Sequence, residues 1–174
     1  KESVNLDAWM SSPSHTQHIY NRYGEQADAC ITEGTAALFD GYRRMQGSSA
    51  EIANILNLPV ILLVNARMAG YSVAPLLYGY KHFYSGVHIA GVIFNQVSSP
   101  AHYAHLREAC SDTGLDCLGY LPVIEEVKLF PKHNAISLAN RRIIDEQANI
   151  VASQIEKSID ISRMLNRCNR NFPC

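Results

Sequence analysis

Two carboxylates near the end of a short apolar run could support phosphoryl chemistry. Glu33 follows the run at residues 27–32, and Asp40 comes seven residues later, directly before Gly41. Two carboxylates at the mouth of one strand can hold Mg²⁺ and steer a phosphoryl group, because phosphoryl transfer depends on positioning and charge neutralisation. The spacing taken alone favours a simpler alternative, in which Glu33 bonds a neighbouring loop and Asp40 forms a turn with Gly41.

Asn95 is a candidate for recognising a base. It closes the apolar segment Gly91-Val-Ile-Phe-Asn95. A carboxamide offers a donor and an acceptor side by side, which suits the N6/N7 edge of adenine. The alternative, an asparagine that only caps the following loop, is the more common use of this residue type.

Histidines and cysteines give weaker signals. Two histidine pairs at i,i+3 spacing could each share a metal from one helix face, His15 with His18 and His102 with His105. No cysteine or carboxylate completes either set in sequence, so solvated helix faces are expected instead. The five cysteines contain no C-x-x-C pair, which indicates neither a zinc site nor a disulfide framework. Cys30 and Cys117 are expected to be small buried residues of strands.

The elements that position these residues alternate between strand and helix. Apolar runs predict strands at residues 27–32, 59–64, 87–94 and 115–121. Caps and periodicity predict helices at residues 13–23, 48–56, 72–84, 100–113 and 140–165. Ser12 is the expected N-cap of the first of these helices, and Ser48 opens a capping box with Glu51 at the second. No hairpin signal separates the strands, so the pattern predicts an α/β fold with a doubly wound, mostly parallel sheet and helices on both faces. Ligands of such sheets bind beyond the carboxyl ends of the strands, where Glu33, Asn95 and Pro122 fall.

Composition narrows the function classes. Apolar residues make up 47% and charged residues 18%, which is consistent with a sheet buried on both faces, and the net charge of −1 argues against a general nucleic-acid binder. No apolar run is long enough to cross a bilayer, and no signal peptide is recognisable, so a cytoplasmic location is expected. Neither G-x-x-x-x-G-K-[ST] nor G-x-G-x-x-G occurs, so a nucleotide would need a phosphate cradle from outside these 174 residues.

Five segments in order resemble the cobyrinic acid a,c-diamide synthase family, specifically its ATP-binding synthetase domain. Asn5-Leu-Asp-Ala-Trp-Met10 resembles N-L-D-P-W-M, and Glu33-Gly-Thr-Ala-Ala-Leu-Phe-Asp-Gly41 resembles E-G-V-M-G-L-F-D-G. Ser48-Ser-Ala-Glu-Ile-Ala53 with Leu58-Pro-Val60 resembles S-T-A-E-[IL]-A and L-P-V. Gly91-Val-Ile-Phe-Asn-Gln-Val97 with His102 resembles G-V-I-L-N-R-V and its later histidine. Leu118-Gly-Tyr-Leu-Pro122 with His133 resembles L-G-x-[LI]-P and a downstream R-H-L-G-L.

The resemblance implies an ATP-dependent glutamine amidoligase with a P-loop-type fold related to dethiobiotin synthetase. The family amidates the a- and c-side-chain carboxylates of cobyrinic or hydrogenobyrinic acid in cobalamin biosynthesis, with ATP, Mg²⁺ and ammonia from glutamine. Carried over, Glu33 would ligate or position Mg²⁺, and Asp40 would lie by the transferred phosphoryl group. Asn95 would read adenine, with the backbone near Pro122 flanking the base. The substrate side would include Asn5, Asp7 and His133.

Departures from the family pattern set expectations about this chain. Ala8 replaces a proline, residues 35–37 replace V-M-G, and residues 132–135 read Lys-His-Asn-Ala where R-H-L-G is expected. The family's P-loop would precede Lys1 and its glutaminase domain would follow Cys174, so residues 1–165 are expected to be part of the synthetase domain, incomplete at its N-terminus, with 166–174 a tail. Such a fragment is not expected to be active alone.

The expected partners are the corrin substrate and a glutaminase domain, with a homodimer as an open alternative and neither nucleic acid nor membrane. Two other interpretations stay open. One is a related ligase, cobyric acid synthase or an enzyme like dethiobiotin synthetase, and the other is a noncatalytic binding domain that lacks a P-loop.

Overall fold

A computed structural model describes residues 3–127 and 138–169, which divide into two compact units. The first contains residues 3–60 and 84–88 with the described end of the chain at 168–169. The second contains residues 61–83, 89–127 and 138–167. Among these residues, no helix is both long and apolar enough to cross a membrane.

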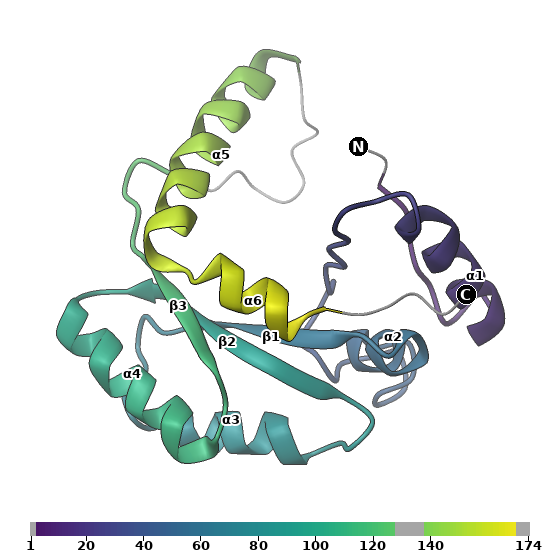
Figure 1. Cartoon of the computed structure of the whole chain (residues 1–174), viewed down its shortest axis with the longest axis horizontal. Coiled ribbons are helices and arrows are strands. Elements are labelled where there is room, and N and C mark those ends of the chain that lie inside the picture. Colours follow the sequence, from purple (N-terminus) through teal and green to yellow (C-terminus); the bar gives the residue numbers. More distant parts are fainter. Residues whose placement is uncertain (1–2, 128–137, 170–174) are drawn as a thin grey trace. The chain divides into compact units, whose positions relative to one another are not determined.

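The second unit is built on a three-stranded sheet with the order β1-β2-β3 (Figure 1). The strands are β1 (Pro59–Asn65), β2 (His88–Val97) and β3 (Cys117–Pro122). One helix connects each strand to the next, and β2 pairs with β3 in parallel. The predicted α/β architecture with a parallel sheet is confirmed.

The central and edge strands of this sheet differ in burial. In β2, Val92 and Phe94 are fully buried and Val97 is 1% exposed, as the continuous apolar run predicts. In β1, which the sequence equally predicts to be buried, Leu63 is 63% exposed. That expectation was wrong because β1 is the edge strand among the described residues, with a neighbouring strand on one side only.

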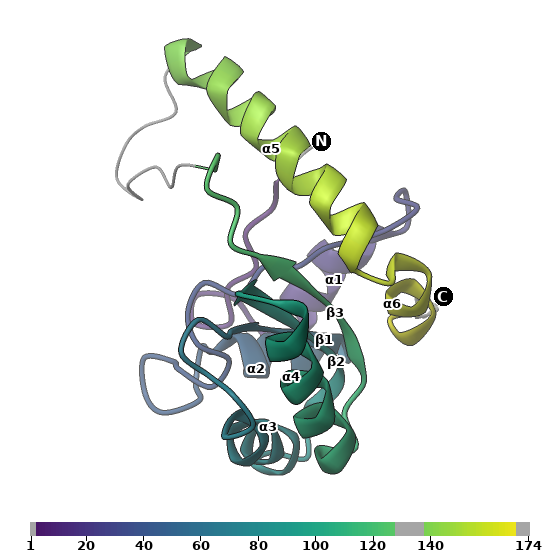
Figure 2. The ribbon, with the colours of Figure 1, turned by 90° about the vertical axis from the view of Figure 1, so that its left-hand side faces the viewer.

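Helices lie on both faces of the sheet in this unit, as Figures 1 and 2 show. The helices α3 (Val73–His82) and α4 (Pro100–Thr113) pack together on one face. The end of α5 (Leu138–Ser158) and α6 (Ile161–Arg167) lie on the other. There Ile93, Leu118 and Ile159 form a buried cluster, against which Met164 of α6 packs.

The long C-terminal helix predicted for residues 140–165 is instead two helices. Asp160 begins α6 because its Oδ1 accepts the backbone N–H of Arg163 at 2.9 Å, a typical N-cap contact. Its own N–H donates to the carbonyl of Leu118, and the preceding Ile159 pairs with Gly119 of β3. The helix therefore ends where its backbone bonds to the sheet, an interaction that helical periodicity cannot reveal.

The first unit packs α1 (Pro13–Gly24) against α2 (Ser49–Leu56). Both predicted N-caps are confirmed, since Ser12 accepts from His15 N and Ser48 from Glu51 N, each at 3.2 Å. Gln17 of α1 also donates through Nε2 to the carbonyl of Ile55 at 2.9 Å. These contacts fix the two helices to each other.

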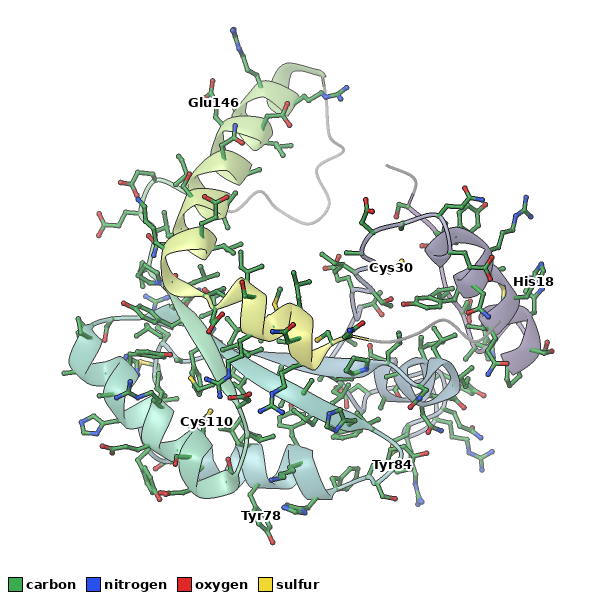
Figure 3. The ribbon with its side chains drawn as sticks, in the orientation of Figure 1. His18, Cys30, Tyr78, Tyr84, Cys110 and Glu146 are labelled. Carbon is green, nitrogen blue, oxygen red and sulfur yellow. The ribbon has the colours of Figure 1, made fainter. Side chains whose placement is uncertain are left out.

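Residues 27–32 do not form the predicted strand. They run as an irregular segment in which Ile31 is 96% exposed, and Cys30, predicted to be buried, is exposed (Figure 3). An extended segment becomes a strand only where a neighbour accepts its backbone hydrogen bonds, and no described residue pairs with this one. Glu33 therefore follows a loop and does not end a buried strand.

Candidate functional site

The loop with both candidate carboxylates is fastened to the start of α2. The carbonyl of Leu38 accepts the N–H of Ala50 at 2.8 Å, in the first turn of that helix. At the other end of the segment Gly34 lies against Ser49, so closely that a Cβ on Gly34 would stand 2.6 Å from the serine Oγ. The structure thus brings together two segments that sequence separates, the one at 33–41 and the one at 48–53.

A second set of bonds closes the helix end. Ser48 is 1% exposed and caps Glu51, while the Glu51 carboxylate accepts the N–H of Gly47 at 2.5 Å. This reciprocal use of a serine and a glutamate resembles a capping box, displaced by one residue toward the loop. The loop and the helix therefore form one hydrogen-bonded piece of structure.

Residues 41–46 form a tight turn immediately after Asp40. Gly41 N donates to Arg44 O at 2.7 Å, and Tyr42 N donates to Gln46 O at 3.0 Å. Arg44 takes a left-handed conformation with φ 55°, and Gly41 is so enclosed that a Cβ there would lie 2.0 Å from the Gln46 carbonyl oxygen. Only glycine fits at position 41 in this turn.

The carboxylates of Glu33 and Asp40 are both exposed on this loop. Within residues 3–127 and 138–169 neither carboxylate has a hydrogen bond or an ion pair, and no group of three or more potential ligands gathers into a protein-only metal site. Mg²⁺ commonly binds one or two carboxylates plus waters and substrate phosphates, so this sparse donor set fits that ion. The two carboxylates alone do not fit a structural metal site.

Asp7, a candidate on the substrate side, already has a local role. Its Oδ1 accepts the N–H groups of Trp9 at 2.7 Å and Met10 at 3.3 Å, which makes an Asx turn. Asn5, the other candidate in this segment, is exposed. His133 lies outside the described residues.

In the second unit, the predicted strand ends do meet at one edge of the sheet. Ala66 N donates to Asn95 O at 2.8 Å, and Val97 is in register with Pro122. The Asn95 side chain is half-buried, and its Oδ1 accepts the N–H of Gln96 at 2.9 Å. Gln96 has φ 60° and lies at a register shift between Phe94 and Val97, so β2 is irregular at this point. The Asn95 Oδ1 is thus already hydrogen-bonded to the backbone of the next residue, as the loop-capping alternative predicts.

His102 is a residue that sequence reasoning treated as part of a solvated helix face, and this was wrong. Its Nδ1 lies 3.2 Å from the N–H of Ser98, and its Nε2 lies 2.6 Å from the carbonyl of Ala69. Because an N–H only donates and a carbonyl only accepts, the ring carries its proton on Nε2. His102 therefore connects the loop after β1 to the start of α4. The sequence signal that could have identified His102 was its position after the family-like segment at residues 91–97.

Cys110 and Cys117 form a small polar cluster with Tyr103 beneath α4. Cys110 is 1% exposed on the inner side of that helix (Figure 3), and the Tyr103 hydroxyl lies 3.4 Å from the Cys117 sulfur. A hydrogen bond from the Cys110 thiol, aided by the Tyr103 hydroxyl, lowers the pKa of Cys117 to about 6 against the opposing effect of burial. The same bond and burial raise the pKa of Cys110. Cys117, predicted to be buried, is half-buried at the start of β3.

Comparison with known proteins identifies the family. The family model described as an AAA domain matches residues 4–129, more than two thirds of the chain. The chain belongs to this family. Membership of the AAA domain family implies that the domain binds a nucleotide, although its phosphate-binding motif is not among these 174 residues.

The curated relatives that match this chain are named cobyrinate or hydrogenobyrinate a,c-diamide synthases. A cobyrinate a,c-diamide synthase from Caldanaerobacter subterraneus subsp. tengcongensis is 34% identical over 94% of this chain and 37% of its own length. A hydrogenobyrinate a,c-diamide synthase from Brucella ovis is 37% identical over 92% of this chain and 36% of its own length. A cobyrinate a,c-diamide synthase from Dehalococcoides mccartyi is 35% identical over 97% of this chain. No solved structure matches.

These relatives confirm the family resemblance that the five sequence segments indicated. The chain spans little more than a third of the length of the curated relatives it matches. Regions of those relatives outside the match have no counterpart among these 174 residues.

Proposed function

We propose that this chain is part of the ATP-binding synthetase domain of a cobyrinate or hydrogenobyrinate a,c-diamide synthase. The observation that carries the proposal is similarity to enzymes of these names over more than nine tenths of the chain, at 34% and 37% identity. The anchored loop at 33–41 supports it, because it presents, from a fixed backbone, two carboxylates that have no partner among the residues that the structure describes.

The reaction in this proposal has two steps. A substrate carboxylate oxygen attacks the γ-phosphorus of ATP, the bond to the bridging oxygen breaks, and ADP leaves, which gives an acyl phosphate. Ammonia from glutamine then attacks the acyl carbon, inorganic phosphate leaves, and a proton is lost to give the amide. The first step is needed because a free carboxylate is a poor acylating agent. Positioning and charge compensation are the protein's main contributions to such a transfer.

Glu33 and Asp40 serve the phosphoryl transfer in this proposal. Glu33 would hold or position Mg²⁺, which supplies charge neutralisation when bound. Asp40 would lie by the transferred group and orient the substrate carboxylate. The turn at 41–46 and the bonds to α2 restrict the backbone of both, and this restriction is what positioning requires.

Asn95 and Pro122 serve the adenine. The Asn95 Oδ1 already accepts from Gln96 N, so its Nδ2 is the group available to donate to the base, while Oδ1 keeps a second lone pair. Pro122 lies one strand away in register with Val97, and the backbone there would flank the ring.

The remaining assignments follow from the family. Asn5, Asp7 and His133 would belong to the substrate side, and a glutaminase domain outside these residues would supply ammonia. Residues 1–165 would belong to the synthetase domain and 166–174 to a tail, in a cytoplasmic enzyme. A homodimer is compatible with this arrangement.

Replacement of Asp40 tests the catalytic assignment. In the complete natural protein, we expect Asp40→Asn to lower kcat for amidation of cobyrinic acid at least about 100-fold, the scale of losing one charge-stabilising group. ATP affinity, measured by calorimetry, should stay within about twofold, because the change removes a charge at the reacting centre and leaves binding contacts in place.

A matched control is Asp28→Asn, since Asp28 is also exposed in the first unit. It should leave turnover unchanged. Wild-type turnover in Asp40→Asn would overturn the role of Asp40, and a wild-type protein that cannot amidate cobyrinic acid or hydrogenobyrinic acid would overturn the proposed function.

A further inference from the structure

Three large apolar side chains of the first unit are exposed next to the candidate site. Trp9 is 69% exposed, Met10 78% and Tyr42 65%, and the rings of Trp9 and Tyr42 are 6.1 Å apart between centroids with their planes tilted by 54°. We call these three residues the aromatic ledge. Tyr42 is only two residues after Asp40, so the ledge adjoins the proposed phosphoryl-transfer loop.

We propose that the aromatic ledge is the surface on which the macrocycle of the corrin-type substrate packs, with Arg43 and Arg44 pairing with its peripheral carboxylates. This inference rests on the proposed function and adds the residues that select the substrate. A flat, largely apolar macrocycle ringed by carboxylates needs a broad aromatic contact for its face and cations near its rim.

The local backbone holds Trp9 and Met10 outward. Asp7 Oδ1 accepts the N–H groups of both residues, so the Asx turn fixes their backbone while their side chains stay in solvent. Asp7 is therefore a positioning residue for the ledge. Exposure of two such large apolar side chains in one turn has a cost in water, which contact with an apolar ligand would relieve.

Tyr42 is supported from behind. Its N–H bonds to Gln46 O at 3.0 Å, and a Cβ on Gly47 would lie 2.8 Å from the Tyr42 ring. Gly47 also has φ 75°, which favours glycine. The ring therefore lies against bare backbone at Gly47 and is still largely exposed, with Trp9 as its aromatic neighbour.

Two exposed cations lie in the same turn as Tyr42. Arg43 and Arg44 follow Tyr42 in the same turn, both are exposed, and they line a shallow open pocket with Met45 and Gln46. No ion pair engages either arginine in the described residues. An exposed ring in one turn with two arginines that have no ion pair among the described residues fits a polycarboxylate macrocycle better than it fits an uncharged apolar partner.

Steady-state kinetics of the complete natural protein test the ledge. We expect Trp9→Ala and Tyr42→Ala each to raise the KM for cobyrinic acid about tenfold, with kcat and the KM for ATP within about twofold, because a contact equal in ground and transition states affects KM alone. Arg43→Gln should raise the same KM and weaken the effect of salt on it.

Asp7 separates positioning from charge. Asp7→Ala removes the Oδ1 acceptor of the turn, so it should raise the KM for cobyrinic acid as Trp9→Ala does, whereas Asp7→Asn keeps that acceptor and should raise the KM less. Tyr78→Ala is the matched control, since Tyr78 is 58% exposed on α3 of the second unit and points away from the sheet (Figure 3). It should change neither KM.

Trp9, the only tryptophan among these 174 residues, gives an independent measurement of direct binding, taken as the difference in tryptophan fluorescence between the complete natural protein and its Trp9→Phe variant. Cobyrinic acid should quench its fluorescence saturably without ATP, with a midpoint that rises about tenfold in Tyr42→Ala. An unchanged KM for cobyrinic acid in folded Trp9→Ala, Trp9→Phe and Tyr42→Ala variants of an amidating enzyme, together with an unchanged midpoint in Tyr42→Ala, would overturn the ledge alone. A rise in the KM for ATP without a rise in the KM for cobyrinic acid would also overturn the ledge. A wild type that does not amidate would overturn the proposed function instead.

Discussion

Two regions of this chain show similar apolar signals in sequence and opposite structures. Residues 87–94 and 27–32 are both short apolar runs followed by a polar candidate residue. The former lies in β2 at the centre of the sheet, with Phe94 fully buried, while the latter is an exposed loop. The comparison teaches that an apolar run becomes a strand only when hydrogen-bonding neighbours are present on the sheet.

The same contrast separates the glycines of the two units. Gly119 of β3 has φ 140° and lies where α5 ends, so that a Cβ would stand 2.2 Å from Ser158 O. Gly41 of the first unit lies inside a surface turn, where the atoms nearest to its Cβ position belong to Gln46 and Arg44 of the same turn. We therefore expect glycine substitutions to affect global stability in the second unit and local order near the candidate site in the first.

The largest effect should follow Gly119→Ala. The added methyl forces the backbone of β3 away from Ile159 and strains φ, and we expect about 3 kcal/mol of lost unfolding free energy. Urea denaturation measures it. Gly79→Ala is the control, because nothing lies within 4 Å of its Cβ position on α3, and it should stabilise by about 0.5–1 kcal/mol. Equal free energies of unfolding for Gly119→Ala and Gly79→Ala would contradict the close packing of the α5–α6 junction against β3.

A smaller and more local effect is expected for Gly41→Ala. The new Cβ would collide with the Gln46 carbonyl, so the turn must open, at a cost of about 1–3 kcal/mol confined to this loop. Hydrogen exchange should show the Gly41 position and Tyr42 losing protection while β2 keeps it. The rate of amidation by the Gly41→Ala variant should also fall. If β2 loses protection equally, the two units do not respond independently and the comparison fails.

The smallest expected effect is on the reactivity of Cys117, a thiol of the second unit. The hydrogen bonds from Cys110 and Tyr103 set the pKa of Cys117 to about 6, so its alkylation by iodoacetamide should rise as pH passes about 6 in the native protein. In urea the rise should move toward about 8.5, the value of an ordinary thiol. Tyr103→Phe should shift the native midpoint upward because it removes one donor that stabilises the thiolate.

Cys30 supplies the counterpart in the first unit. It is exposed in the loop at 27–32, so its alkylation rate should be almost the same in native and unfolded protein. Strong native protection of Cys30, measured by mass spectrometry of the labelled peptides, would mean that this segment is buried and paired after all.

Local chemistry was enough to predict much of the architecture. The serine caps at Ser12 and Ser48, the strand ends at Asn65 and Pro122 and the parallel order of the sheet all follow from short-range patterns, whereas β2 runs past its predicted end at Asn95 to Val97. Caps and turns depend on side chains a few residues apart, and a continuous apolar run is typical of a central parallel strand. The five family-like segments were likewise readable in order.

Tertiary contacts decided the rest. Periodicity could not show that Asp160 would donate to Leu118 and break the C-terminal helix, nor that His102 would bond to Ala69 across 33 residues of sequence. It could not place Leu38 on the first turn of α2, which gives the candidate site its fixed backbone. Each of these is a hydrogen bond between groups distant in sequence, and its energy depends on where the folded backbone places both partners. Residue type and spacing therefore named the candidates, while the folded chain determined which of them were free to act on a ligand.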